Sequence, residues 1–324
     1  MTQERTPAAK PDRGHGTIAV IAALLANLGI AAAKFIGFLI SGASSMLAEA
    51  FHSVADSGNQ AMLLTGSRVA RREPDRRHPF GHGRVRYFAA FLVAVVLFTL
   101  GSLFSLYEGY EKLRHPHELE SPLVALAILV VALVLEGVSL RTAVREAGPM
   151  RGRQSWWSFI RATKQPELAV VLLEDTAAEL GLSFALLGVG LTAVTGDPLY
   201  DALGTLAIGA LLAVVAVVLG FEMYSLLLGE AASPEEQATI RDTLAATPGI
   251  AHLLQLRTMH LAPEELLVAA RFELDHDLSG DDAARVIDQA QAQVRQAVPS
   301  ARIIYLEPEL PSAEAPQPGR RSQR

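Results

Sequence analysis

Long apolar runs separated by short polar segments dominate the first 230 residues of the chain. Four of these runs can cross a bilayer without interruption, because about 20 apolar residues span its hydrocarbon core. They cover residues 17–40, 87–107, 122–140 and 202–228. Two more runs, 43–66 and 168–195, have sufficient length but contain charged residues. The pattern predicts an all-α transmembrane bundle of six helices.

Beyond residue 230 the pattern changes to that of a small soluble domain. Ser233 fits the N-cap of a helix, with Pro at N1 and Glu236 at N3, as in a capping box. Two alternating apolar segments follow at 251–260 and 265–274, then a helix capped near Ser279 and the strand "RIIYLEP". The order α-β-β-α-β predicts a cytoplasmic α+β domain of the ferredoxin-like type.

These changes in pattern divide the chain into four expected parts. We expect a cytoplasmic N-terminal segment at 1–15, a six-span transmembrane domain at 16–230 and a cytoplasmic α+β domain at 231–310. The tail at 311–324 is rich in Pro, Ser, Gln and Arg, a composition typical of disorder.

Composition supports a multi-pass integral membrane protein. Half of the 324 residues are hydrophobic and the mean hydropathy is +0.28, which is high for a soluble domain. A soluble helical bundle with an unusually apolar core is the alternative. The first run lacks a small-residue cleavage site at its end, so we interpret it as a retained span rather than a signal peptide. The chain has no cysteine, which excludes disulfides and thiolate metal sites.

The distribution of positive charge predicts the orientation in the membrane. Basic residues precede the first run and fill the loops after the second and fourth runs, whereas the intervening loops are nearly free of them. These basic residues are Arg5, Lys10, Arg13, Arg68, Arg71, Arg72, Arg76, Arg77, Arg84, Arg86, Arg141, Arg145, Arg151, Arg153, Arg161 and Lys164. The positive-inside rule then places both termini in the cytoplasm. We expect the plasma (inner) membrane as the location.

Two of the predicted spans each carry a pair of ionisable residues four positions apart. His52 and Asp56 share one helical face in the second span, and Asp175 and Glu179 share one in the fifth. If the two faces meet, one imidazole and three carboxylates converge, a set that suits tetrahedral Zn²⁺ and related divalent metals. The alternative is that each pair is a polar patch that pairs with a neighbouring helix for stability.

The loop after the second span contains a weaker candidate for a metal site. In "DRRHPFGHGR", Asp75, His78 and His82 have spacings that allow them to bind a cation at the cytoplasmic mouth. Histidine-rich loops are common, so this signal is unspecific by itself.

Taken together, these motifs resemble the cation diffusion facilitator family of metal-ion transporters. The resemblance rests on HxxxD in the second span, "FGHGR" in the loop, the paired acids of the fifth span and the α+β tail. Within the family, "HSVADSGNQAMLL" and "LEDTAAELG" are most similar to the branch that includes the ninth mammalian zinc transporter. The resemblance implies a homodimer that exports Zn²⁺ or another divalent cation against an inward flow of protons. Its transport site would comprise His52, Asp56, Asp175 and Glu179, with the cation as cargo and no prosthetic group.

The chain also departs from the family pattern. Many zinc-selective members have a histidine where this chain has Asp175, and the position of Glu179 is often apolar in the related branch. Glu174 lies about 100° round the helix from Asp175 and is a candidate for a proton path or a helix contact. Leu254, Arg271 and Tyr305 occupy positions where the family's cytoplasmic binuclear site often has histidines. The remaining polar residues nearby, which we expect to be strand-end surface residues, are His252, His260, Asp275, His276 and Asp277.

The alternatives differ in chemistry. "HPHELE" lacks the second histidine of the HExxH motif and lies in an expected outside loop, which argues against a membrane metalloprotease. We expect a transporter and not an enzyme. No nucleic-acid-binding motif is present. A cation channel or uniporter using the same acidic site remains an alternative to a proton-coupled carrier. Three carboxylates and one imidazole also allow Mn²⁺, Fe²⁺ or Co²⁺, although Zn²⁺ is our first choice.

Overall fold

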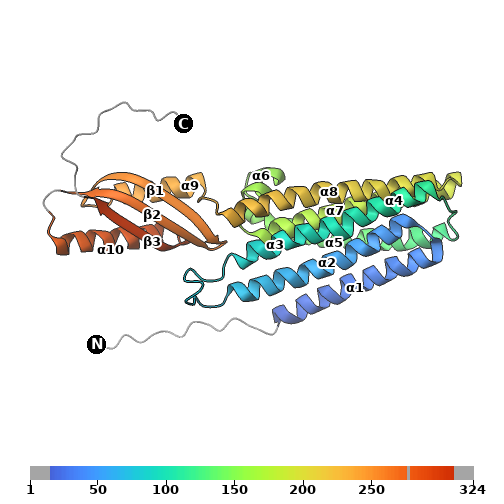
Figure 1. Ribbon diagram of the computed structural model, residues 1–324, viewed down its shortest axis with the longest axis horizontal. Coiled ribbons are helices and arrows are strands. Elements are labelled where there is room, and N and C mark those ends of the chain that lie inside the picture. Colours follow the sequence, from blue (N-terminus) through green and yellow to red (C-terminus); the bar gives the residue numbers. More distant parts are fainter. Residues whose placement is uncertain (1–14, 276–277, 310–324) are drawn as a thin grey trace, which may run out of the picture. The chain divides into compact units, whose positions relative to one another are not determined.

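The computed structural model describes residues 15–275 and 278–309, with side chains described from Asn27 onward (Figure 1). The chain divides into two compact units. Within the described residues, the first unit comprises those up to Arg68 together with Phe88–Met223, and the second comprises Val69–Tyr87 together with those from Tyr224 onward.

Helices make up the regular structure before residue 230. They are α1 (His15–Ser41), α2 (Ser44–Ala70), α3 (Val85–Val96), the π-helical segment η1 (Leu97–Leu103), α4 (Phe104–Arg114), α5 (Pro122–Arg151), α6 (Trp156–Ala162), α7 (Pro166–Thr195) and α8 (Leu199–Leu228). Proline at the first turn begins α5 and α7, and a left-handed glycine, Gly196, ends α7.

Four helical segments are long and apolar enough to cross a membrane within the described part of the chain. They are Val85–Arg114, Pro122–Arg151, Pro166–Thr195 and Leu199–Leu228. The described apolar part of α1, Asn27–Ser41, is shorter, and α2 carries a stripe of ionisable residues that lowers its hydropathy. The multi-pass membrane architecture is therefore confirmed, whereas the count of six spans stays a prediction.

Exposed apolar side chains show which surfaces suit lipid. On α5, Val131, Val134 and Val138 are 59%, 61% and 61% exposed, and Phe221 on α8 is 71% exposed. Apolar surface of this extent is costly in water but costs nothing against acyl chains.

The fourth predicted span differs most from its expected boundary. The helix continues past the expected end at residue 140 as far as Arg151. Three arginines that we assigned to the following loop therefore belong to the helix. A short helix, α6, then begins at Trp156 after the N-cap Ser155, whose hydroxyl accepts a hydrogen bond from the backbone N–H of Ser158. Phe159 of α6 is buried against Ala143 of α5 and Leu172 of α7. This packing replaces the loop that charge alone predicted.

The third span contains a π-helical segment that periodicity did not predict. The Ser102 hydroxyl in this segment donates a hydrogen bond to the Gly209 carbonyl of α8 at 2.9 Å. A Cβ added at Gly209 would lie 2.8 Å from Leu106, so glycine is needed for this close approach of two helices.

The second unit contains α9 (Pro234–Ala245), β1 (Ile250–Ala262), β2 (Glu265–Leu274), α10 (Gly280–Ala297) and β3 (Ala301–Glu309). The predicted order α-β-β-α-β is confirmed, including the capping box of Ser233 and Glu236. Strand β2 is central, antiparallel to β1 and parallel to β3. The core of the unit includes Leu244 of α9, Phe272 of β2 and Ala290 of α10. The ferredoxin-like assignment stays a prediction.

Residues 69–87 belong to the second unit because they pack against the β1–β2 hairpin. The Arg86 guanidinium pairs with Glu264 at 2.8 Å. Gly83 lies so close to the hairpin that an added Cβ would be 2.5 Å from the Cβ of Ala262. Gly81 has a φ of +80°, a conformation that favours glycine. In "FGHG", the backbone conformation therefore favours glycine at position 81, and the close packing favours glycine at position 83.

Candidate metal site

Helix α2 carries a stripe of four polar residues inside the first unit. Glu49, His52, Asp56 and Asn59 recur at spacings of three and four and therefore share one helical face. Glu49 and Asn59 are fully buried, and the His52 side chain is 1% exposed. An apolar membrane helix has no use for such a stripe unless each member has a partner.

The two ends of the stripe have protein partners. The Lys34 ammonium of α1 lies 3.0 Å from Glu49 Oε2. At the other end, Asn59 Nδ2 donates a hydrogen bond to Glu174 Oε1 of α7 at 2.5 Å. These contacts connect α2 to one helix at each end of the stripe.

The middle of the stripe lacks such partners. Neither ring nitrogen of His52 makes a hydrogen bond, and Oδ1 of Asp56 is also without one. The two side chains face each other at 3.5 Å between His52 Nδ1 and Asp56 Oδ1. A buried polar atom without a hydrogen bond costs about 1–3 kcal/mol. Imidazole nitrogen and carboxylate oxygen are donors that Zn²⁺ and similar cations accept, so this pair fits one side of a cation site.

The predicted partners on α7 are turned toward a different helix. Asp175 Oδ2 accepts a hydrogen bond from the Ser139 hydroxyl of α5 at 3.0 Å, and Glu179 lies beside Gly137, also on α5. The face that α7 presents to α2 carries Glu174 instead. Among the described residues, no three of His52, Asp56, Asp175 and Glu179 bring their ligand atoms within 4.8 Å of one another. The structure thus brings His52 and Asp56 together. Asp175 and Glu179 do not face them, because Asp175 lies about 100° round α7 from Glu174, the residue that faces α2.

Two further carboxylates belong to this region. Glu174, considered from sequence as a proton-path or helix-contact residue, hydrogen-bonds Asn59 and interacts electrostatically with Asp56. Glu136 of α5 interacts electrostatically with Asp56, Asp175 and Glu179. Sequence reasoning did not identify Glu136, although an isolated acid in "VALVLEGVSL" was an available signal.

The loop residues predicted as a second candidate do lie together. Asp75, His78 and His82 form the one group of three possible metal ligands within 4.8 Å that the described residues contain. His78 Nδ1 lies 3.2 Å from Asp75 Oδ1, and His82 Nε2 lies 3.7 Å from Asp75 Oδ2. A hydrogen bond from the His78 backbone N–H lowers the pKa of the Asp75 carboxyl, and one from Arg77 adds to the effect.

The described residues of the second unit from Tyr224 onward do not assemble a comparable cluster. Leu254 and Tyr305 are 45% and 58% exposed, and Arg271 pairs with Glu307 and Glu309. The expectation that His260 is a surface residue is wrong, because it is buried near the end of β1, where its backbone N–H donates to the Glu230 carbonyl. His276 and Asp277 lie outside the described residues.

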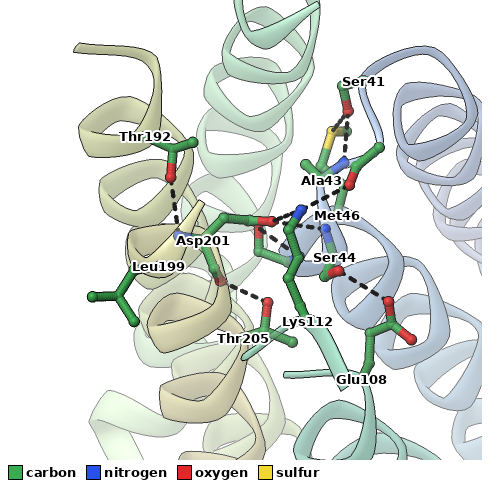
Figure 2. A network of polar contacts seen from close by, with 12 residues as sticks. Ser41, Ala43, Ser44, Met46, Glu108, Lys112, Thr192, Leu199, Asp201 and Thr205 are labelled. Atoms are coloured by element: carbon green, nitrogen blue, oxygen red, sulfur yellow. Dashed lines mark hydrogen bonds and ion pairs between the residues drawn. The ribbon is translucent and has the colours of Figure 1, made fainter. Parts of the chain in front are cut away.

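A separate polar network joins α2, α4 and α8 (Figure 2). The Lys112 ammonium of α4 lies 2.9 Å from Asp201 Oδ2 of α8, and both side chains are fully buried. Asp201 also accepts hydrogen bonds from the backbone N–H groups of Ser44 and Ser45 and from the Ser45 hydroxyl, and so caps the start of α2. Every oxygen of this carboxylate has a partner, which distinguishes the network from the middle of the polar stripe.

Comparisons with known proteins identify the family to which both parts of the chain are similar. A family model described as "Cation efflux transmembrane domain" matches residues 20–228, and one described as "Cation efflux protein, cytoplasmic domain" matches residues 232–309. The chain is 34% identical over 271 residues to the mitochondrial proton-coupled zinc antiporter SLC30A9 of Mus musculus, covering 83% of this chain and 47% of the relative.

Two shorter relatives give a wider comparison. Metal tolerance protein C4 of Arabidopsis thaliana is 28% identical over 82% of this chain and 58% of its own length. The cation-efflux pump FieF of Escherichia coli is 27% identical over 94% of this chain and 95% of the relative. The chain spans about half the length of the animal relatives it matches.

Proposed function

Because this chain belongs to the cation efflux family of membrane transporters, we propose that it exports a divalent metal cation, with Zn²⁺ the first choice. Transporter relatives confirm the expectation that the chain is not an enzyme. The observation that carries the proposal is the pair of His52 and Asp56 in the first unit. His52 is buried, Asp56 is half-buried beside it, and both have buried polar atoms without a hydrogen-bond partner.

In this proposal His52 and Asp56 supply one half of the transport site, and Asp175 and Glu179 supply the other. A rotation or shift of α7 would bring its acidic pair toward α2, and such helix shifts are an established form of switching between states. Asp175 now hydrogen-bonds Ser139, a contact that the cation would replace. The loop residues Asp75, His78 and His82 are a second proposed binding site.

Proton coupling follows from the chemistry of the ligands. A cation requires neutral imidazole and ionised carboxylates, so protons and metal compete for the same atoms. The name of the mouse relative includes "proton-coupled zinc antiporter", which supports antiport by alternating access for this chain. A match to the cytoplasmic-domain model ZT_dimer supports a homodimer. A plasma (inner) membrane location stays a prediction, since the animal relatives are named as mitochondrial.

The test is metal uptake into liposomes that contain the purified protein and have an imposed pH gradient. We expect Asp56→Ala and Asp175→Ala to abolish Zn²⁺ transport and Glu179→Ala to weaken it. Glu146→Gln is the control, because it removes an exposed carboxylate of α5. Near wild-type transport by both Asp variants would show that the site is elsewhere.

Two further arms of this assay refine the proposal. Transport that ignores the pH gradient would indicate a uniporter or channel rather than an antiporter. Competition by Mn²⁺, Fe²⁺ and Co²⁺ would rank the metals. Comparing Glu174→Gln with Asp175→Asn then identifies which of the adjacent acids on α7 binds the cation.

A further inference from the structure

Lys34 is a fully buried lysine in the apolar part of α1. Its side chain has no exposed surface, and its sequence neighbours in "GIAAAKFIGFLI" are almost all apolar. A charge placed at such a depth in a membrane is costly, so it requires a partner and usually has a function. The ammonium has two partners on α2, Glu49 Oε2 at 3.0 Å and Ser53 Oγ at 2.8 Å.

Both partners lie next to the proposed site. Glu49 precedes His52 by one turn, and Ser53 follows His52 directly on α2. The positive charge of Lys34 also interacts electrostatically with His52 and Asp56. A buried positive charge thus acts on the atoms that are proposed to receive a cation.

Helix α7 closes the other side of Glu49. A Cβ added at Gly181 would lie 2.5 Å from Glu49 Oε1, so a larger residue there would displace this carboxylate from its present position. Glu49 therefore lies between the lysine of α1 and the backbone of α7. The pair of Lys34 and Glu49 connects three helices at the level of the polar stripe.

We propose that Lys34 is a positioning residue that sets the affinity of the transport site for its cation. The inference rests on the proposed function. Lys34 neutralises Glu49, which keeps that carboxylate from acting as an additional cation ligand, and its positive charge weakens cation binding at His52 and Asp56. Transport requires binding that is weak enough for release, and a fixed positive charge beside the site meets this requirement.

Single removals of the two charges have opposite expected effects. Lys34→Met leaves Glu49 as an unpaired negative charge, so the KM for Zn²⁺ should fall by about tenfold, with a lower maximal rate because release is slower. Glu49→Gln leaves the lysine charge uncompensated, so the KM should rise by about tenfold. The double variant Lys34→Met/Glu49→Gln should have a KM between those of the single variants. Lys34→Arg retains the charge and should remain closest to the wild type.

Lys112→Met is the matched control. It also removes a buried, ion-paired lysine, but one that belongs to the Asp201 network. It should lower thermal stability without lowering the KM. If Lys34→Met does not fold, Glu49→Gln and the double variant still test the sign of the effect.

The inference fails if Lys34→Met and Glu49→Gln leave the KM unchanged or move it in the same direction, as a purely structural pair would. This result is distinguishable from failure of the proposed function. If the proposed function is wrong, Asp56→Ala and Asp175→Ala will transport normally, whatever the Lys34 variants do.

Discussion

Single residues within the first unit differ chiefly in whether their polar atoms have partners. Lys34 pairs with Glu49, and Asn59 with Glu174, so each end of the α2 stripe has a partner on another helix, while Glu49 Oε1 and Asn59 Oδ1 make no hydrogen bond. His52 and Asp56 retain atoms without hydrogen bonds between these ends. Burial makes such atoms costly, and a cation would satisfy them.

Single residues also determine the chemistry of the loop cluster, formed by Asp75, His78 and His82. The pKa of the Asp75 carboxyl is lowered there. A group whose pKa is lower in the folded state contributes stability above its unfolded value, and this contribution is lost as the pH falls through the folded value. Asp75 therefore stays ionised between pH 5 and 7, where histidines ordinarily gain a proton. The Asp75 carboxylate is therefore available to a cation throughout that range.

We expect Asp75→Asn to weaken Zn²⁺ binding at the loop by about tenfold or more, a loss that even outer-shell partners of metal sites can cause. At a fixed Zn²⁺ concentration, the variant should also release the metal at a higher pH than the parent protein, because protons displace a more weakly bound cation more readily. Zn²⁺ titration between pH 5 and 7, in an Asp56→Ala background, measures both quantities. Unchanged affinity and an unchanged release midpoint would contradict this account.

Among the elements, α2 depends most on its neighbours, because its own hydropathy is low. Asp201 of α8 caps its first turn through the N–H groups of Ser44 and Ser45. Lys112 of α4 completes that network (Figure 2). The start of α2 is thereby fixed to two other helices, and the polar stripe begins about one turn further along.

We predict that Asp201→Asn lowers the free energy of unfolding by about 3–5 kcal/mol, because it leaves the Lys112 charge buried without its counterion. Adding Lys112→Met should recover part of the loss, since no unpaired charge then remains. Thermal unfolding in detergent, followed by circular dichroism, compares the variants. Equal melting temperatures for Asp201→Asn and the wild type would show that the ion pair contributes nothing.

The molecule as a whole is predicted to have a fixed orientation in its membrane. Glu118 lies in the exposed segment before α5, and Gln154 lies in the turn after it. If α5 spans the bilayer, these two positions are on opposite sides. The chain has no cysteine, so one introduced cysteine provides a unique label at either position.

We expect Glu118→Cys to react with a membrane-impermeant maleimide in intact cells. Gln154→Cys should react only after permeabilisation, because the basic loops are predicted to be cytoplasmic. The reverse pattern would invert the topology, and labelling of both sites in intact cells would mean that α5 does not span.

Local patterns determined much of this protein from the sequence. Apolar runs predicted the membrane helices, the i, i+4 spacing of His52 and Asp56 predicted their contact, and Ser233 and Glu236 predicted the capping box. These features depend on residues close in the chain, so periodicity and spacing suffice. The extension of α5, the helix α6 and the π-helical segment depend on packing between helices, which spacing does not report.

Only the tertiary structure decided how α7 is turned and which charges compensate each other. From the sequence we expected Asp175 in the transport site and Glu174 in a proton path or a helix contact, and the fold directs Glu174 to α2 and Asp175 to α5. Lys34 and Glu49 lie 15 positions apart on different helices, and Glu136 joins the site from a third. The energy of a buried charge depends on its nearest partner in space, and that partner comes from the packing of distant segments.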